Sequence, residues 1–186
     1  MQLKRILVPT DLSEGSIDGI KYALFLAKGN DAEVVVVYVV DAKKVPQAAS
    51  MPDEVRMFFG MEGMPVETLG HYFVEGVLEK GWWKLSNFLS RHMDIEMPGS
   101  VKLKKVVRLG EVVDEIVGAS TAEDCDLIVM ASGGKNWLTR LVWGSLTEKV
   151  VRLASCPVLT IQPFARVRQD GERVPVRLLM VGESHA

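Results

Sequence analysis

One stretch of the sequence constrains the fold more than any other: the β-branched run at 32–40, Ala-Glu-Val-Val-Val-Val-Tyr-Val-Val. From Val34 to Val40 it is continuously apolar, without the polar alternation of a strand that has one face in water. Parallel sheets are covered by helices on both faces, and their central strands show this pattern. The run therefore predicts a central strand of a parallel sheet.

Four further strand patterns alternate with helical patterns along the chain. The first strand ends at Val8 or Pro9, because proline cannot continue a central ladder, and the next helix follows Ser13, a residue type that caps helices. The predicted strands cover 3–8, 32–40, 101–107, 126–130 and 157–161, and the predicted helices cover 14–29, 66–96, 110–117 and 145–154. This alternation predicts an α/β fold with a doubly wound, five-stranded parallel sheet and helices on both faces.

Two segments fall outside the alternation. Residues 41–65 contain three prolines and two glycines without steady periodicity, which indicates a long connection of the kind that often covers a site as a lid. After Pro163 the chain turns polar and then offers one more apolar stretch, Val174 to Val181. We therefore expect one domain over 1–163 and a polar C-terminal tail over 164–186. Its extra strand would pair with an edge of its own sheet or of a partner's.

The charge balance argues against two classes of partner. The formal net charge is -2, and neither nucleic acid nor an anionic membrane is expected without an excess of clustered Lys and Arg. No apolar run approaches the roughly 20 residues that a membrane-spanning helix needs. The N-terminus enters a strand pattern at once, without the sections of a secretory signal, so we expect a cytoplasmic protein.

No metal site is expected from the histidines and cysteines. His71, His92 and His185 are scattered, without the spacing that metal ligation requires. Cys125 and Cys156 are too few for a disulfide framework, and Cys125 lies beside an apolar strand, where inert buried thiols are common.

The most informative segment runs from Met130 to Ser145, Met-Ala-Ser-Gly-Gly-Lys-Asn-Trp-Leu-Thr-Arg-Leu-Val-Trp-Gly-Ser. It resembles the nucleotide-binding motif of the universal stress protein family, in which glycine, two residues, glycine and nine residues precede glycine with serine or threonine. Gly134, Gly144 and Ser145 match this motif in register, and Ala131 stands where the family usually has its first glycine.

Separate anchors extend the resemblance over roughly residues 1–163. They are Ile-Leu-Val-Pro-Thr-Asp at 6–11, Tyr-Val-Val-Asp at 38–41 and Cys-Pro-Val-Leu at 156–159. The resemblance implies the fold of the adenine nucleotide alpha hydrolases, with strand order 3-2-1-4-5. It also implies a homodimer formed through the last strand, Val158–Ile161, whose apolar edge would otherwise need protection.

The physical chemistry of the loop supports a phosphate site independently of the family. Residues that follow parallel strands emerge at their carboxyl ends, where open α/β sheets bind ligands. Glycines at 133, 134 and 144 leave backbone N–H groups open to a phosphate, and Ser145 begins a helix whose positive end attracts it. Ser145 and Glu148 also form a capping box, so a purely structural helix start is the alternative.

The resemblance also implies which residues meet the nucleotide. It places Asp11 near the ribose and Pro9, Thr10 and Val39 near the base, although taken alone Asp11 is a turn residue and Val39 a core valine. Lys135 either pairs with a phosphate or is solvated. The expected nucleotide-binding residues are Pro9, Thr10, Asp11, Val39, Met130, Ala131, Gly133, Gly134, Lys135, Gly144, Ser145, Leu146 and Thr147.

These observations predict a stress-response regulatory protein that binds an adenine nucleotide, ATP or AMP, with or without Mg²⁺. The alternative is a dimeric interaction module of the same fold, in which Ala131 or the tryptophans close the crevice to nucleotides. No general base is evident near the loop, so at most slow, incidental ATP hydrolysis is expected and no catalytic residue is assigned.

Overall fold

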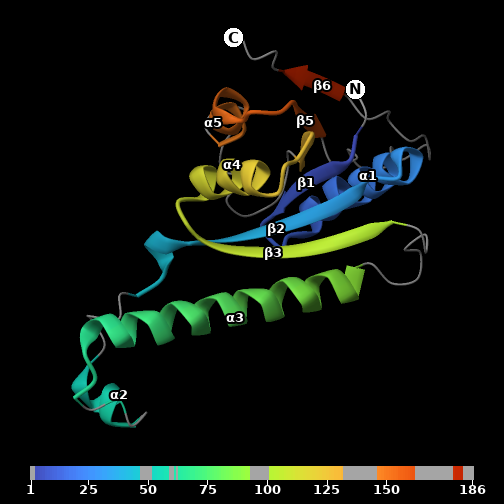
Figure 1. The fold of residues 1–186 in the computed structure, drawn as a ribbon. Coiled ribbons are helices and arrows are strands. Elements are labelled where there is room, and N and C mark those ends of the chain that lie inside the picture. Colours follow the sequence, from blue (N-terminus) through green and yellow to red (C-terminus); the bar gives the residue numbers. More distant parts are fainter. Residues whose placement is uncertain are drawn as a thin grey trace, which may run out of the picture.

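The computed structural model describes residues 3–46, 52–58, 61, 63–92, 101–131, 146–161 and 178–181. Helices and strands alternate through most of this part of the chain (Figure 1). In chain order they are β1 (Arg5–Thr10), α1 (Glu14–Asn30), β2 (Glu33–Asp41), the short 3₁₀ helix η1 (Ala42–Lys44), α2 (Asp53–Phe58), α3 (Val66–His92), β3 (Lys102–Gly110), α4 (Val112–Ala122), β4 (Leu127–Ala131), α5 (Leu146–Leu153), β5 (Val158–Ile161) and β6 (Leu178–Val181).

The strands form one sheet in the order β3-β2-β1-β4-β5-β6. The first five pair in parallel, which confirms the predicted doubly wound sheet and its order. Val34 to Val37 of β2 pair with Ile6 to Pro9 of β1 on one side and with Leu103 to Val106 of β3 on the other. The valine run at 32–40 is therefore an internal strand, as its continuous apolar pattern indicates.

Helices cover both faces of the sheet, α1 and α3 on one face and α4 and α5 on the other (Figure 1). Side chains alternate between the two cores along each strand. Ile6 and Val8 of β1 pack with α1 and α3, whereas Leu7 packs with α4 and α5. Val34 and Val36 of β2 join the first core, and its odd-numbered valines join the second. Each face thus buries an apolar layer, which accounts for the absence of polar residues in the run.

The long helix α3 lies close against the sheet at Gly81. A Cβ added to Gly81 would lie 2.7 Å from Cγ1 of Val107 and 3.3 Å from Cγ2 of Val40, so a larger residue would push the helix off β2 and β3. Figure 1 shows α3 running along β3, with its amino-terminal half reaching beyond the sheet toward α2. Two short helices, η1 and α2, form within residues 41–65, where the sequence indicated only a connection.

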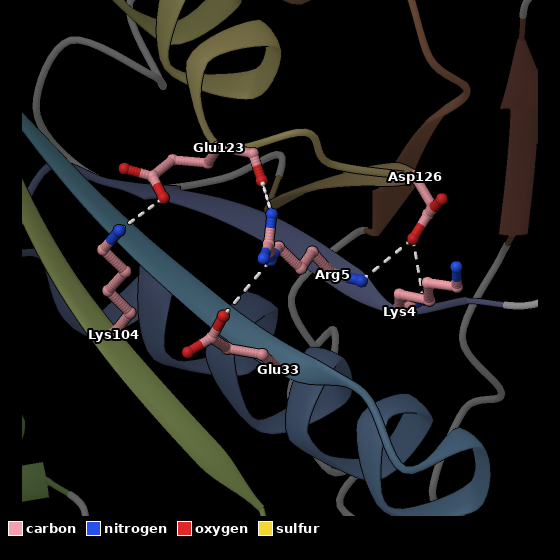
Figure 2. Close-up of polar contacts among 6 residues, drawn as sticks. All are labelled: Lys4, Arg5, Glu33, Lys104, Glu123 and Asp126. Atoms are coloured by element: carbon pink, nitrogen blue, oxygen red, sulfur yellow. Dashed lines mark hydrogen bonds and ion pairs between the residues drawn. The ribbon is translucent and has the colours of Figure 1, made fainter.

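Polar contacts tie the amino-terminal ends of the strands together (Figure 2). Oδ2 of Asp126, just before β4, accepts hydrogen bonds from the backbone N–H groups of Lys4 and Arg5, at 2.6 and 2.9 Å. The Arg5 guanidinium donates to the carbonyl of Glu123 and pairs with Glu33, and Lys104 pairs with the Glu123 carboxylate. These contacts fix β1 against β4 and β2 at the end of the sheet opposite the predicted site.

The C-terminal tail adds a strand to the edge of the sheet beyond β4. The sequence left two partners open for this strand, an edge of its own sheet or of a partner's. In the structure β6 pairs antiparallel with β5 of the same chain along its whole length, from Val158 with Val181 to Ile161 with Leu178, so the first alternative is confirmed. Among the described residues, no helix is both long and apolar enough to cross a membrane.

Candidate functional site

The two central strands β1 and β4 separate toward their carboxyl ends. They pair only at Ile6 with Leu127 and at Leu7 with Ile128, whereas β1 pairs with β2 along its whole length, as far as Thr10 with Tyr38. Strand order reverses between β1 and β4, since the chain passes to β2 on one side and to β4 on the other. Ligands of doubly wound sheets bind at such a point, outside the carboxyl ends of the strands.

Helix α1 packs directly over this divergence. A Cβ added to its Gly19 would lie 3.3 Å from Cβ of Ala131 on β4 and 3.7 Å from Cγ1 of Val8 on β1. The Ala131 side chain is 3% exposed and belongs to the core on the α1 face. Its methyl group therefore packs against the helix.

A chain of hydrogen bonds orders the turn between β1 and α1. The backbone N–H of Leu12 donates to Oγ1 of Thr10, 3.0 Å away. The hydroxyls of Thr10 and Ser16 lie 2.7 Å apart, and the Ser16 hydroxyl donates to the carbonyl of Ser13, also at 2.7 Å. Since Ser16 donates its proton to Ser13, it accepts from Thr10. Both hydroxyls are buried and paired, so the Thr10 side chain holds the turn.

The same turn presents the carboxylate of Asp11, which is 8% exposed. Oδ1 of Asp11 accepts hydrogen bonds from the backbone N–H and the hydroxyl of Ser13. Ser13 occupies the N-cap position of α1, but its side chain accepts no capping hydrogen bond from the helix; its hydroxyl is directed to Asp11 and donates to Oδ1. Oδ2 of Asp11 is buried and has no hydrogen-bond partner among the described residues.

Backbone strain accompanies this arrangement. Leu12 adopts a φ of 62°, a left-handed conformation that leucine rarely takes and that costs about 1–2 kcal/mol. Non-glycine residues persist in such conformations only where surrounding contacts hold them, and they concentrate at ligand sites. The hydrogen bonds of Thr10 and Asp11 supply those contacts here.

Tyr38 of β2 belongs to the same region, next to the end of β1. Burial raises the pKa of its hydroxyl, and the negative charge of Asp11 raises it further. The phenol therefore stays neutral at physiological pH, able to donate one hydrogen bond and accept another.

The structure brings together part of the predicted site. Pro9, Thr10 and Asp11 lie at the end of β1, next to Val39 on β2, and Met130 and Ala131 end β4. The Val39 and Met130 side chains are buried in the core on the α4 and α5 face, and Leu146 and Thr147 begin α5. The other predicted residues, Gly133, Gly134, Lys135, Gly144 and Ser145, lie outside the described residues.

Four residues that shape this region were not assigned to the site from the sequence. Ser13 was identified only as a helix cap, although its hydroxyl bonds to Asp11. Ser16 and Gly19 lie on the buried face of α1, and Tyr38 lies within an apolar run. A buried serine one turn into an amphipathic helix is the one signal that pointed to a polar network.

The described residues offer no cluster of three or more His, Cys, Asp or Glu that would hold a metal ion. Cys125 is buried and Cys156 is partly so. Burial raises the pKa of the Cys125 thiol to about 12 and also raises that of Cys156. Both thiols are therefore protonated at neutral pH, and this favours a packing role over a reactive one.

Comparisons with known proteins agree with this architecture. The family model described as "Universal stress protein family" matches residues 2–162. The universal stress protein MJ0531 of Methanocaldococcus jannaschii is 31% identical over 159 residues, which cover 86% of this chain and 82% of the relative. The solved structure of the protein MJ0577, presented as a structure-based assignment of its biochemical function, has a TM-score of 0.60 at 25% identity and covers 87% of this chain and 97% of its own.

A third comparison concerns fold alone. The crystal structure of a universal stress protein in complex with cAMP has a TM-score of 0.51 at 15% identity and covers 88% of this chain and 99% of its own.

Proposed function

The chain belongs to the universal stress protein family, and from this premise we propose that it is a regulatory protein of the stress response that binds an adenine nucleotide. The ligand is ATP or AMP, and it occupies the crevice at the carboxyl ends of β1 and β4. The ribose lies at Asp11, and the phosphates lie toward the glycines of the loop after β4.

Oδ2 of Asp11, which has no hydrogen-bond partner among the residues that the structure describes, carries this proposal. A buried carboxylate oxygen without a hydrogen bond leaves about 1–3 kcal/mol of desolvation uncompensated, and more when it is charged. Ribose hydroxyls are donors, and a carboxylate is purely an acceptor, so a ribose diol would satisfy this atom. Because Ser13 holds Oδ1 from the other side, the carboxylate is already oriented before a ligand arrives.

The fold and the sequence also support the choice of an adenine nucleotide and the proposed position of its phosphates. The cAMP complex shows, for that protein, that a chain of this fold holds an adenine nucleotide. In the present chain, Gly134, Gly144 and Ser145 match the phosphate-binding motif in sequence, and Ser145 immediately precedes the first residue of α5. Backbone N–H groups at a helix start bind phosphate oxygens without any cationic side chain.

The competing function is an interaction module that does not bind nucleotides. Ala131 was the main observation in its favour. That support is weakened, because the methyl group is buried against Gly19 instead of projecting into the crevice.

Calorimetric titration tests the proposal. Protein stripped of carried-over ligand is titrated with ATP, AMP and GTP, with and without Mg²⁺. We expect at least one adenine nucleotide to bind more tightly than GTP. Asp11→Asn replaces the acceptor oxygen with an amide in the same shape, and affinity is expected to fall at least about tenfold, equivalent to about 1.4 kcal/mol.

Asp31→Asn is the matched control. It removes the same charge by the same isosteric change, at the opposite end of α1. The left-handed backbone conformation there, with φ of 52°, is tolerated by asparagine as well as by aspartate. Affinity should stay within about twofold of the parent, since the change lies far from the crevice. Failure of both ATP and AMP to bind at millimolar concentration would contradict the proposal.

A further inference from the structure

The charged residues of α1 and α3 are separated by sign along each helix. In α1 the acidic residues lie within 14–20 and the lysines within 21–30. In α3 the acidic residues lie within 66–79, and lysine and arginine lie within 80–92. The net charge of -2 therefore conceals a local group of cations without carboxylates among them. We call this group the basic strip; its members are Lys21, Lys28, Lys80, Lys84 and Arg91.

The two lysines of α1 lie on the flank of the helix that faces away from β4. Gly19 faces β4, since a Cβ added to it would lie 3.3 Å from Cβ of Ala131. Consecutive helix residues are about 100° apart, so Lys21 lies about 200° around α1 from Gly19. Lys28 follows Lys21 by two turns and shares its flank. Helix α3 packs on β2 and β3, on the side of β1 away from β4, so this flank is directed toward α3.

The three cations of α3 lie on the flank directed toward α1. Trp82 faces the edge strand β3, because Nζ of Lys105 lies over its ring, 4.3 Å from the centroid. Lys80 and Lys84 each lie two residues from Trp82, and thus on the opposite side of the helix. Arg91 follows Lys84 by two turns and continues the same row. The basic strip is therefore made of two rows of cations that face each other from neighbouring helices.

No internal partner neutralises the basic strip. Within the part of the chain that the structure describes, none of its five members forms an ion pair, whereas cations of β1 and β3 pair with glutamates. The helix dipole favours Lys28 and Arg91, which lie in last turns, but its effect does not reach the other three. Like charges four residues apart, as in Lys80 and Lys84, disfavour the helix. This arrangement favours binding of an external polyanion.

Two exposed aromatic side chains accompany the basic strip, and they indicate which polyanion it fits. Phe25 of α1 is 71% exposed, and Trp83 of α3 is 59% exposed. Phe25 lies one turn after Lys21, and Trp83 adjoins Lys84. Proteins bind single-stranded nucleic acid by combining cations that contact the backbone with aromatic rings on which bases stack. An acidic peptide would pair with the cations but offers no bases to the rings.

We propose that the basic strip binds single-stranded nucleic acid, with the phosphates along the two rows of cations and bases stacked on Phe25 and Trp83. These contacts recognise charge and aromatic faces, so binding tolerates different base sequences. The strip occupies the later parts of α1 and α3, whereas Asp11 precedes α1, so the strip and the nucleotide crevice are separate sites. Net charge alone gives no sign of the strip, because its members come from segments far apart in the sequence.

Fluorescence anisotropy with a labelled oligouridine of about 12 nucleotides tests this inference on the full chain. Affinity should fall with salt, with a slope of log K against log salt of about -2 to -3.5, as expected for three to five phosphate contacts of a single strand. Lys21→Gln with Lys84→Gln should weaken binding at least about tenfold and reduce the slope by about one. Lys43→Gln with Lys149→Gln removes the same charge outside the strip and should change affinity less than about twofold. Equal effects of the two pairs, or no binding at low salt, would overturn the inference.

Three further measurements separate this site from its alternatives. Trp83→Ala should weaken binding at least about fivefold through lost stacking, whereas Trp82→Ala, on the opposite flank, should change it less than about twofold. Polyglutamate of equal charge should bind at least about tenfold more weakly than the oligouridine, and equal affinity would contradict the role of the rings. Asp11→Asn should leave oligouridine binding unchanged, since loss of binding in that variant would place the strand in the crevice. Circular dichroism establishes that each variant is folded.

Discussion

The methyl group of Ala131 lies against Gly19, so closely that a Cβ on Gly19 would come within 3.3 Å of it. Ala131 stands at a position where the family usually has glycine, and α1 accommodates the added methyl by having none of its own at the point of contact. The alanine and the glycine are complementary across the junction of β1, β4 and α1, which keeps the backbone beside the crevice in place.

This contact predicts an energetic coupling between the two positions. Gly19→Ala alone should add about 1 kcal/mol to the free energy of unfolding through helix propensity, but crowding against Ala131 offsets this gain. In a chain that also carries Ala131→Gly, the crowding is relieved and the gain in stability remains. We expect a coupling free energy of about 1 kcal/mol from a double-mutant cycle measured by urea unfolding. Effects that add within about 0.5 kcal/mol would mean that the two residues do not constrain each other.

The same contact predicts that Ala131→Gly leaves nucleotide affinity nearly unchanged. Stability should fall by about 1 kcal/mol, because one buried methyl group is lost and glycine gains freedom in the unfolded chain. Affinity for the adenine nucleotide, measured by calorimetry, should stay within about twofold, since the methyl group packs toward α1. A large gain in affinity would show that the methyl group obstructs the ligand.

Thr10→Val is expected to destabilise the protein without changing its shape. The valine removes a hydroxyl that accepts from the Leu12 N–H and donates to Ser16. It leaves the Leu12 N–H without this acceptor and leaves the Ser16 hydroxyl with only its bond to the Ser13 carbonyl. The free energy of unfolding should fall by about 2 kcal/mol. Thr121→Val on α4 is the control. Its exposed hydroxyl makes one long hydrogen bond of 3.3 Å, so the change should be within about 0.5 kcal/mol. Equal effects in the two variants would show that the turn network does not stabilise the fold.

The sheet and its order were predictable because each rests on a local pattern. The run at 32–40 specifies a strand buried on both faces, and the alternation of strands and helices specifies parallel crossovers. The edge at β5 was not predictable, because the apolar stretch at 174–181 fits an edge of its own sheet or of a partner's equally well. Pairing of strands far apart in sequence depends on tertiary contacts that no local pattern records.

The candidate site was predictable at the level of residue types but not of contacts. Asp11 was identified from the resemblance, yet the sequence does not show that Ser13 holds one of its oxygens while the other has no hydrogen-bond partner in the described part of the chain. Ser13 has the residue type of a helix cap, yet its side chain accepts no capping hydrogen bond and its hydroxyl donates to Asp11. Gly19 resembles any helix glycine until its distance to Ala131 is known.

Asp126→Asn is expected to make stability less dependent on acid pH. The backbone N–H of Arg5, and next that of Lys4, holds the pKa of Asp126 below its ordinary value. Such a carboxyl contributes stability that is present above its unfolded pKa of about 3.9 and is lost as the pH falls through the folded pKa. At neutral pH the free energy of unfolding of the variant should be about 1 kcal/mol lower than that of the parent, a modest figure because the carboxylate is partly exposed. Urea unfolding from neutral to acid pH measures this difference, which should become smaller below about pH 4. A difference that does not change with pH would mean that Arg5 and Lys4 do not favour the ionised form.

Two glycines of α3 are expected to respond in opposite directions to the same substitution. Gly81→Ala places a methyl group 2.7 Å from Cγ1 of Val107, a short branched side chain fixed on β3, so either the helix or the strand must move. We expect the free energy of unfolding to fall by about 1–2 kcal/mol despite the better helix propensity of alanine. Gly76 lies on the same helix, and a Cβ added there has no neighbour within 4 Å. Gly76→Ala should therefore raise the free energy of unfolding by about 0.5–1 kcal/mol. Thermal and urea unfolding of both variants measure the difference. If Gly81→Ala also stabilised the protein, the close packing of α3 on β2 and β3 would not hold in solution.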